Sequence, residues 1–354
     1  MTSINRSLRF FGAIATLLIL STLGFTAGAG DKPNAYTQTN LVSDQPGVVP
    51  PPRIDQNLVN AWGLAFNPNA VAWVADNGKG KATLYDGNGN VQPLVVTIPP
   101  VPPATQSKPT GIVFNSSGDF DASAFIFSTE DGTIAGWTSG TTAVTKFTAR
   151  DGAIYKGLAI GGNGNAHFLY ATDFHNAKID VFGTDFKRKR LRCSFFDPRI
   201  PRGFAPFGIQ NLNGNLYVTY AKQDADREDD VAGQGLGFVN VFDANGCLIR
   251  RVATRGQLNA PWGLAIAPAD FGKFSNNLLV GNFGDGRINA YDVDNDTFRG
   301  QLRRGNGKFL VIDGLWGLAF GNGVRQQPTN VLFFTAGPDD ENHGLYGRIK
   351  ADHP

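Results

Sequence analysis

A six-residue motif built on Trp-Gly-Leu-Ala returns along the chain and limits what it can fold into. Close copies occupy Ala61–Phe66, Pro261–Ile266 and Leu315–Phe320. Looser copies at 109–114, 155–160 and 206–211 fill the gaps, so the six glycines are separated by 48, 46, 51, 55 and 54 residues. A near-constant period of this length with strand-like content is typical of a β-propeller. We therefore predict an all-β, six-bladed β-propeller whose blades start near residues 60, 108, 155, 205, 260 and 314.

Each copy of the motif has the alternation of a β-strand. Gly63 and Ala65 fall on one side of such a strand, and Trp62, Leu64 and Phe66 fall on the other. A glycine weakens a strand interior unless another backbone must approach it closely. We therefore expect the six motif strands to be the innermost strands of the blades, where they converge on the axis. The motif tryptophans are expected to pack between blades, and stacking on a ligand is the alternative.

The rest of each repeat predicts hairpins, and the last repeat is one strand short. Asp76-Asn77-Gly78 and Asp131-Gly132 stand between alternating apolar runs, which is a strong hairpin signal. After the third strand of the sixth repeat only residues 351–354 remain. Residues 36–42, ahead of the first motif, can supply the missing strand. Pairing them with the last blade would close the ring and cover an exposed sheet edge.

The N-terminal segment has the layout of a secretory signal peptide. Arg6 and Arg9 precede an apolar run over 10–23, and Ala27-Gly28-Ala29 offers a small-residue cleavage site. The run is short for a membrane span, so an uncleaved anchor is the weaker alternative. We predict cleavage after Ala29 and an exported protein, periplasmic or extracellular. Residues 30–354 then form a single propeller, with no second apolar stretch long enough to cross a bilayer.

Composition argues against several classes of partner. The 32 Lys and Arg residues nearly balance the 30 Asp and Glu residues, which argues against nucleic acid and membrane surfaces. The glycine-rich turns complete neither a phosphate loop nor a dinucleotide fingerprint, so no nucleotide or flavin is expected. Cys193 and Cys247 are either bridged, as an exported protein permits, or two separate thiols. We expect a monomer.

Polar residues gather where a propeller would present them at one axial face. The turns between second and third strands and the beginnings of the inner strands lie on that face. The turns carry Asp76, Glu130, Asp173, His175, Asp224, Asn282, Asp285, Asp340 and Glu341, and the inner strands begin with Asn60, Thr110, Lys156 and Phe207. Turn propensity alone explains some of these residues, because Asp and Asn favour such turns. As ligand-binding candidates we take Asp76, Lys156, Phe207, Lys222, Asp285 and Glu341.

Several longer segments, read together, resemble a family of exported bacterial proteins of unknown function. They are Asn57–Asn60, the Trp-Gly-Leu-Ala copies, Tyr170–Asn176, Tyr220–Asp226 and Val280–Ile288. The resemblance spans about residues 36–350 and implies no established activity. Some members of that family carry a C-terminal sorting tail of the Pro-Glu-Pro type, and this sequence ends at Pro354 without one.

More distantly, the blades resemble NHL-type propellers and the gluconolactonase and senescence-marker propellers. Those lactonases hold a divalent metal with Glu, Asn and Asp side chains at the axial mouth. Glu130, Asp173 and Asn282 are similar to that set in kind. The resemblance therefore implies a possible metal at the same mouth of this propeller.

Two hypotheses about function follow. The first is an exported binding or scaffold propeller whose axial face takes a small molecule, a glycan or a protein. The second is a metal-dependent hydrolase of the lactonase or esterase type, in which the ion polarises a carbonyl and His175 or Asp224 acts as the base. Binding is favoured because no nucleophile–base pair is visible.

A bound calcium ion is part of this expectation. Glu130, Asp173, Asn282 and Asp340 come from blades two, three, five and six, so they would surround the axis. Converging carboxylates repel one another unless a cation lies among them. Calcium accepts mixed carboxylate and amide oxygens at irregular geometry, so it is the expected ion.

Overall fold

The computed structural model describes residues 1–2, 32–49, 53–164 and 166–353. Residues 3–29 of the predicted signal peptide lie outside the described residues, so its cleavage and the export that it implies stay predictions. Residues 32–354 form one compact unit. Among the described residues, no helix is both long enough and apolar enough to cross a membrane.

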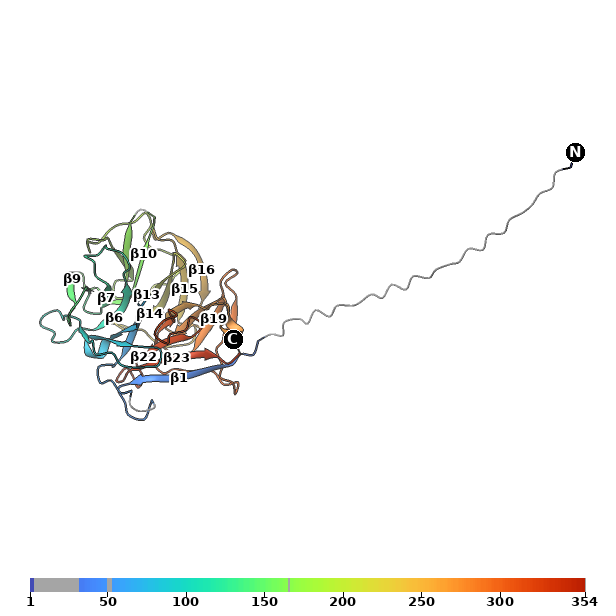
Figure 1. The fold of residues 1–354 in the computed structure, drawn as a ribbon. Coiled ribbons are helices and arrows are strands. Elements are labelled where there is room, and N and C mark those ends of the chain that lie inside the picture. The colour runs from blue at the N-terminus through green and yellow to red at the C-terminus, as the bar shows by residue number, and fades with distance from the viewer. Residues whose placement is uncertain (3–31, 50–52, 165, 354) are drawn as a thin grey trace. The chain divides into compact units, whose positions relative to one another are not determined.

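Six antiparallel sheets stand around a common axis and form a six-bladed β-propeller, as predicted (Figure 1). Five sheets have four strands each, and the third blade has three. The strands of the first three blades are β2 (Ala61–Phe66), β3 (Ala72–Asp76), β4 (Lys81–Tyr85) and β5 (Val96–Thr97); β6 (Pro109–Phe114), β7 (Phe125–Thr129), β8 (Thr133–Trp137) and β9 (Val144–Thr148); and β10 (Tyr155–Gly162), β11 (His167–Asp173) and β12 (Lys178–Phe182).

The other three blades follow the same order from the axis outward. Their strands are β13 (Phe204–Leu212), β14 (Asn215–Lys222), β15 (Gly237–Phe242) and β16 (Leu248–Thr254); β17 (Pro261–Ile266), β18 (Asn277–Asn282), β19 (Ile288–Asp292) and β20 (Phe298–Gln301); and β21 (Leu315–Phe320), β22 (Leu332–Ala336), β23 (Leu345–Ala351) and β1 (Tyr36–Ser43). Two short 3-10 turns, η1 (Asn77–Lys79) and η2 (Gly272–Phe274), are the helical elements of the described residues.

The repeat glycines lie where neighbouring inner strands come closest. A Cβ added to Gly63 would lie 2.5 Å from the carbonyl oxygen of Thr110 in the next blade. The last and first blades approach each other equally closely, because a Cβ on Gly317 would lie 2.8 Å from the carbonyl oxygen of Trp62. Real Cβ atoms need more room than this, so the motif keeps glycine at the point of convergence.

The first strand of the domain belongs to the last blade. β1 pairs antiparallel with β23, with Tyr36 opposite Ala351 and Ser43 opposite Leu345. The Tyr36 hydroxyl donates to the carbonyl of Phe271 at 3.0 Å and accepts from the amide of Phe274 at 3.1 Å. β1 therefore covers the outer edge of blade six and also ties that blade to blade five.

Among the described residues blade three has three strands, and a disulfide holds the chain that follows them. Cys193 and Cys247 are bridged, with their Cα atoms 4.9 Å apart. Cys247 lies in the turn between β15 and β16, so the bridge joins the outside of blade three to blade four. Of the two alternatives left open by the sequence, the structure has the disulfide.

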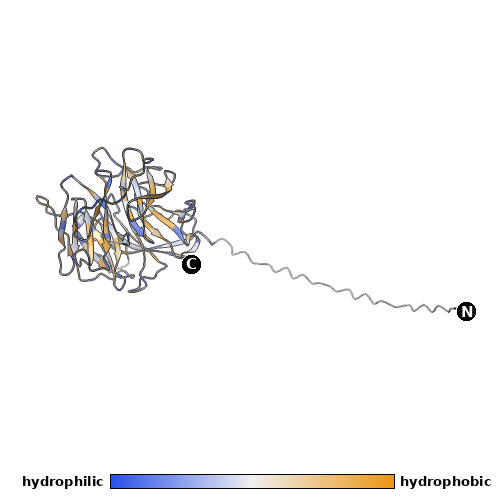
Figure 2. Ribbon diagram, turned by 90° about the horizontal axis from the view of Figure 1, so that it is seen from above, coloured by the Kyte–Doolittle hydropathy of each residue, from blue (hydrophilic) through white to orange (hydrophobic). Residues whose placement is uncertain are grey.

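Most of the core lies between blades. The ring of Trp73 in blade one stacks on that of Phe125 in blade two, with centroids 4.0 Å apart. Apolar residues run along the strands, and hydrophilic residues occupy the connecting loops (Figure 2). Because the apolar side chains are packed between neighbouring blades, polar side chains and cavities can lie along the axis.

Candidate functional site

The upper mouth of the axis, where the inner strands begin, is filled by aromatic rings. We call these rings the aromatic plug: Trp62, Phe174, Phe207, Trp262, Phe283 and Trp316. Trp62 stacks on Trp316 with centroids 3.5 Å apart, and Trp316 stacks on Phe283 at 3.9 Å. The motif tryptophans therefore pack against rings from other blades, as expected, and they do so on the axis. The inner strands approach so closely at the glycines that the preceding side chain projects onto the axis.

Blade three places a lysine where most other blades place an aromatic residue. Lys156 precedes its repeat glycine as Trp62 does, and its side chain is only 2% exposed. Its Nζ pairs with Glu130 and, at 2.9 Å, with Asp229, and it lies 5.2 Å from the centroid of the Trp62 ring. Burial lowers the pKa of the Lys156 ammonium, but the charges of Glu130 and Asp229 outweigh that effect, so the pKa is raised overall.

Two more carboxyl groups surround this ion pair. We call Glu130, Asp229, Asp230 and Glu341 the acidic cluster. Burial, followed by repulsion from Glu130, raises the pKa of Glu341 to about 7. Burial also raises the pKa of Asp230 to about 7; Lys156 opposes that rise, and Glu341 and Asp229 add to it. Asp230 Oδ2 and Glu341 Oε1 are both buried with no hydrogen-bond partner among the described residues.

Two amide side chains join the acidic cluster to the aromatic plug. Asn77 Nδ2 donates to Glu130 at 3.0 Å, and Asn60 Nδ2 donates to the Asn77 side-chain oxygen at 3.3 Å. The Asn60 oxygen in turn accepts from the indole N–H groups of Trp62 at 3.0 Å and Trp316 at 3.2 Å. These bonds fix the orientation of Glu130 relative to the plug.

The backbone that presents Glu341 is strained. Asp339, Asp340 and Glu341 have φ values of 58°, 50° and 66°, in the left-handed region that residues with a Cβ rarely adopt. Such conformations cost roughly 1 kcal/mol or more each and persist where the surroundings enforce them, often at functional sites. The turn between β22 and β23 therefore holds Glu341 in the mouth against a local preference for other conformations.

The four residues predicted to bind calcium do not share one set of contacts. Glu130 belongs to the acidic cluster, Asn282 donates to Asp285 at 3.0 Å, and Asp340 is exposed. Asp173 lies in a second acidic group with Asp151 and Asp180, whose carboxylate oxygens fall within 4.8 Å of one another.

Cationic side chains already occupy that second acidic group. Lys178 approaches Asp151 at 2.9 Å, Asp173 at 3.4 Å and Asp180 at 2.8 Å. Arg188 pairs with Asp151 and Asp180 at 2.9 and 2.6 Å. The group therefore has internal counter-ions, whereas the acidic cluster of the upper mouth has one ammonium for four carboxyl groups.

The remaining predicted site residues lie in different environments. Among the binding candidates, Phe207 is in the aromatic plug, Lys222 is exposed and Asp285 pairs with Asn282. Asp76 is completely buried, and burial raises its carboxyl pKa well above the usual value although Thr83 opposes the rise. Of the predicted bases, His175 has a buried Nδ1 with no hydrogen-bond partner in the described part of the chain, and Asp224 accepts from the amide of Glu228 at 2.9 Å.

Sequence reasoning missed Asp229 and Asp230. They lie in the acidic insertion between β14 and β15, which folds back on itself through bonds from Asp224 N to Asp229 O at 2.9 Å and from Val231 N to Lys222 O at 2.8 Å. This fold brings the far end of the insertion to the mouth. The run of acidic residues in the insertion was visible, but which of them would reach Lys156 was not.

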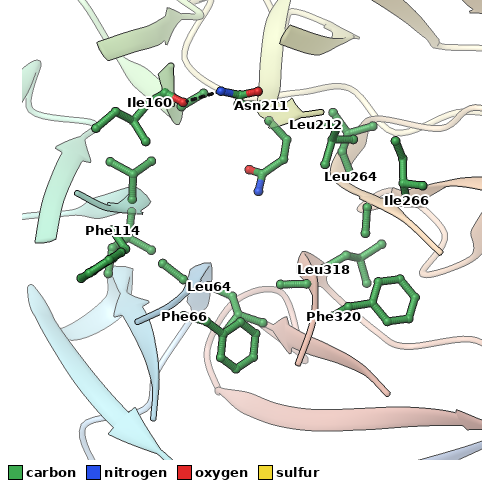
Figure 3. Close-up of a pocket in the computed structure, with 17 residues that line it drawn as sticks. Leu64, Phe66, Phe114, Ile160, Asn211, Leu212, Leu264, Ile266, Leu318 and Phe320 are labelled. Atoms are coloured by element: carbon green, nitrogen blue, oxygen red, sulfur yellow. Dashed lines mark hydrogen bonds between the residues drawn. The ribbon is translucent and has the colours of Figure 1, made fainter. Parts of the chain in front are cut away.

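The opposite end of the axis is open. A cavity of about 530 Å³ lies at the lower mouth, and all six inner strands contribute to its wall. Figure 3 shows Leu64, Phe114, Ile160, Leu264 and Leu318 arranged around its open centre. No ligand-binding candidate was placed there from the sequence.

Comparison with known proteins identifies relatives along most of the chain. No family model matches. The chain is 33% identical over 317 residues to the uncharacterised protein R648 of Acanthamoeba polyphaga mimivirus, covering 84% of this chain and 76% of the relative. It belongs to the family of that protein. The uncharacterised protein L690 of the same virus is 32% identical, with 84% of this chain and 82% of that relative covered.

Solved structures share the family's fold at low identity. The soluble aldose sugar dehydrogenase of Escherichia coli has a TM-score of 0.59 and 15% identity, covering 90% of this chain and 100% of that one. A streptogramin B lyase has a TM-score of 0.55 and 13% identity, covering 90% and 97%. These likenesses show the propeller fold alone. The resemblance to exported bacterial proteins stays a prediction.

Proposed function

We propose that this protein is a binding propeller that takes a cation, or the cationic group of a larger ligand, at its upper mouth. The observation that supports this is the pair of buried carboxyl oxygens without partners, Asp230 Oδ2 and Glu341 Oε1, beside a lysine that other carboxylates already neutralise. Buried polar groups without partners are rare in proteins and call for an explanation.

The charge balance of the acidic cluster favours this class of ligand. When fully ionised, four carboxylates face one ammonium, and burial, with repulsion from neighbouring carboxylates added to it, raises the pKa of Asp230 and Glu341 to about 7. An incoming cation would replace those protons. Lys156 holds Glu130 and Asp229, so Asp230 and Glu341 would supply the new ligand oxygens.

Calcium is the ion that we propose for this position. It accepts six to eight oxygen ligands, including water, at irregular geometry, and the mouth supplies carboxylates in no regular polyhedron. The ligand set differs from that expected from sequence: Glu341 and Asp230 take the place of Glu130, Asp173, Asn282 and Asp340. An ammonium or guanidinium group on a small molecule, glycan or protein would satisfy the same carboxylates.

Calcium titration by isothermal calorimetry at pH 6 and pH 8 tests the proposal. We expect tighter binding at pH 8, since protons compete at pH 6, and at least tenfold weaker binding for Glu341→Gln and Asp230→Asn. Asp226→Asn is the matched control, because Asp226 is exposed on the same insertion. Asp340→Asn separates the two ligand sets: we expect no change, whereas loss of binding would restore the set predicted from sequence. Calcium affinity that is the same in all four variants as in the parent would contradict the proposed site.

A metal-dependent hydrolase is the second candidate. The observation that favours it is the unpartnered Nδ1 of His175, which gives the same face a possible base. A screen of lactone and ester substrates with and without calcium tests the hydrolase hypothesis. Calcium-dependent turnover that His175→Asn abolishes would support the enzyme, and turnover unaffected by that substitution would exclude His175 as the base.

We also propose that the protein is exported, on the strength of its N-terminal sequence. Mass spectrometry of the mature protein from the culture medium or periplasm should find an N-terminus at Gly30. Recovery of the intact chain from the cytosol would contradict this.

A further inference from the structure

The lower cavity is lined by three layers of mostly apolar side chains, and polar backbone groups of the inner strands are exposed between them. The three residues that follow each repeat glycine contribute one layer each. The innermost layer is Leu64, Ile112, Leu158, Ile209, Leu264 and Leu318. The outermost layer is Phe66, Phe114, Ile160, Asn211, Ile266 and Phe320 (Figure 3). The repeat that builds the propeller therefore also builds a lined pocket on its axis.

The pocket is closed at its upper end. A small extension of about 30 Å³ reaches up to the level of the repeat glycines and Trp262. Above it the stacked rings of Trp62 and Trp316 and the buried Lys156 fill the axis. A ligand would therefore enter from the lower face and could not pass through.

Blade four interrupts the apolar wall with two amide side chains. Asn211 is satisfied within the protein: it donates to Ile160 O at 2.8 Å and accepts from Gly214 N at 3.1 Å. Gln210 lines both the cavity and its extension, and among the described residues its side chain has no hydrogen-bond partner. A ligand in the cavity could supply the hydrogen bond that the Gln210 side chain lacks, and such placed polar groups orient ligands in mostly apolar sites.

The wall carries no charge. None of the seventeen lining residues is Asp, Glu, Lys, Arg or His. A charged ligand would lose its hydration without gaining a counter-ion, so the cavity disfavours it. The volume of about 530 Å³ falls within the range of roughly 300–1,000 Å³ that is usual for small-molecule sites.

We propose that the lower cavity binds a neutral, mostly apolar small molecule that carries one hydrogen-bonding group, a hydroxyl or a carbonyl, directed at Gln210. The leucine, isoleucine and phenylalanine side chains would bury the apolar part, and the Gln210 amide would set its orientation. This site is separate from the cation site of the upper mouth, and neither proposal depends on the other.

A fluorescent probe tests the cavity directly. N-phenyl-1-naphthylamine is neutral and apolar, and we expect it to bind the mature protein at micromolar concentration and to be displaced by 1-decanol. Decanoate, which has the same chain length and a charged head, should displace it at least tenfold less well. Ala319→Phe places a ring in the cavity and should reduce probe binding at least tenfold, whereas the exposed Ala269→Phe nearby should not.

The head-group contact has its own variant. Gln210→Leu replaces the amide with an apolar side chain. We expect several-fold more 1-decanol to be needed to displace the probe from this variant, while the probe itself binds as it does to the parent. Unfolding curves for each variant show that loss of binding is not loss of fold. The proposal is overturned if the probe does not bind, if Ala319→Phe binds it as the parent does, if decanoate competes as well as 1-decanol, or if size-exclusion chromatography shows a dimer whose dissociation is needed for probe binding.

Discussion

The two ends of the axis are built by the same six strands, yet one is filled and charged while the other is open and apolar. At the upper mouth the residue before the glycine is large in five of the six blades, and the rings of Trp62, Trp262 and Trp316 meet on the axis. At the lower mouth the residues after the glycine are mostly aliphatic and leave a cavity of about 530 Å³. The comparison teaches that the upper end is closed mainly by the residue before the repeat glycine, with Phe174 and Phe283 completing the plug.

Blade three sharpens the contrast. Its lysine takes a position that three blades give to tryptophan and one to phenylalanine, so a charge is buried where four of the other five blades bury rings. A buried ammonium is tolerated only with paired anions, which accounts for Glu130 and Asp229 at this mouth. The lower wall contains no such residue and needs no counter-ion.

The largest effect should come from breaking the ion pair of the upper mouth. Lys156→Met leaves Glu130, whose side chain is 15% exposed, without its counter-ion. We expect a loss of about 3 kcal/mol in the free energy of unfolding, measured with urea. Lys222→Met, at an exposed lysine, should change it by less than about 0.5 kcal/mol. Adding Glu130→Gln to Lys156→Met should recover part of the loss; a single variant as stable as the parent would contradict the role given to the pair.

The next effect should appear at the glycine ring that separates the two ends. Gly317→Ala would place its Cβ 2.6 Å from Thr335 Oγ1 and 2.8 Å from Trp62 O, so blades six and one would have to move apart. We expect a loss of roughly 1–3 kcal/mol in the free energy of unfolding. Gly118→Ala is the matched control, since an added Cβ there meets nothing within 4 Å. Equal stability of the two variants would mean that the ring is not tightly packed.

The dependence of stability on pH should distinguish the two ends. The folded pKa of Glu341 is about 7, above its usual value of 4.5, so the folded protein holds this proton more tightly than the unfolded chain. Its contribution is complete below about pH 4.5 and is lost as pH rises through 7; for a partly exposed, coupled group we expect roughly 1–2 kcal/mol.

Urea unfolding at pH 5, 6, 7 and 8 without divalent ions measures this decline. The decline of the free energy of unfolding with rising pH should be shallower in Glu341→Gln than in the parent. In Gln210→Leu, whose site is uncharged, it should equal that of the parent. A parent protein whose stability rises steadily from pH 5 to pH 8 would show that Glu341 titrates normally.

The smallest effect should follow from filling the lower cavity. Ala319 lines open space, so Ala319→Phe should change the free energy of unfolding by less than about 1 kcal/mol. Ala290→Phe adds the same ring to a packed core position, 0% exposed, and should lose roughly 1–3 kcal/mol or more. Similar losses in both variants would mean that the cavity is not open to a side chain.

Much of the fold could be predicted from local patterns. The spacing of Gly63, Gly111 and their counterparts predicted six blades, and each motif became an inner strand. The candidate site was predicted less well. Glu130, Lys156 and Glu341 were recognised as polar residues of one face and do meet there, but Asp229 and Asp230 were missed because the path of a ten-residue insertion depends on tertiary contacts.

By itself, the sequence determined the repeat, the strand order within each blade and the glycine at each point of convergence, because these depend on spacing and on the size of single residues. Only the tertiary structure decided that Trp62 and Trp316 meet on the axis, that Lys156 lies among four carboxyl groups and that the lower end stays open. Those features depend on which side chains from distant repeats come into contact, and these contacts form only when the six blades close into a ring.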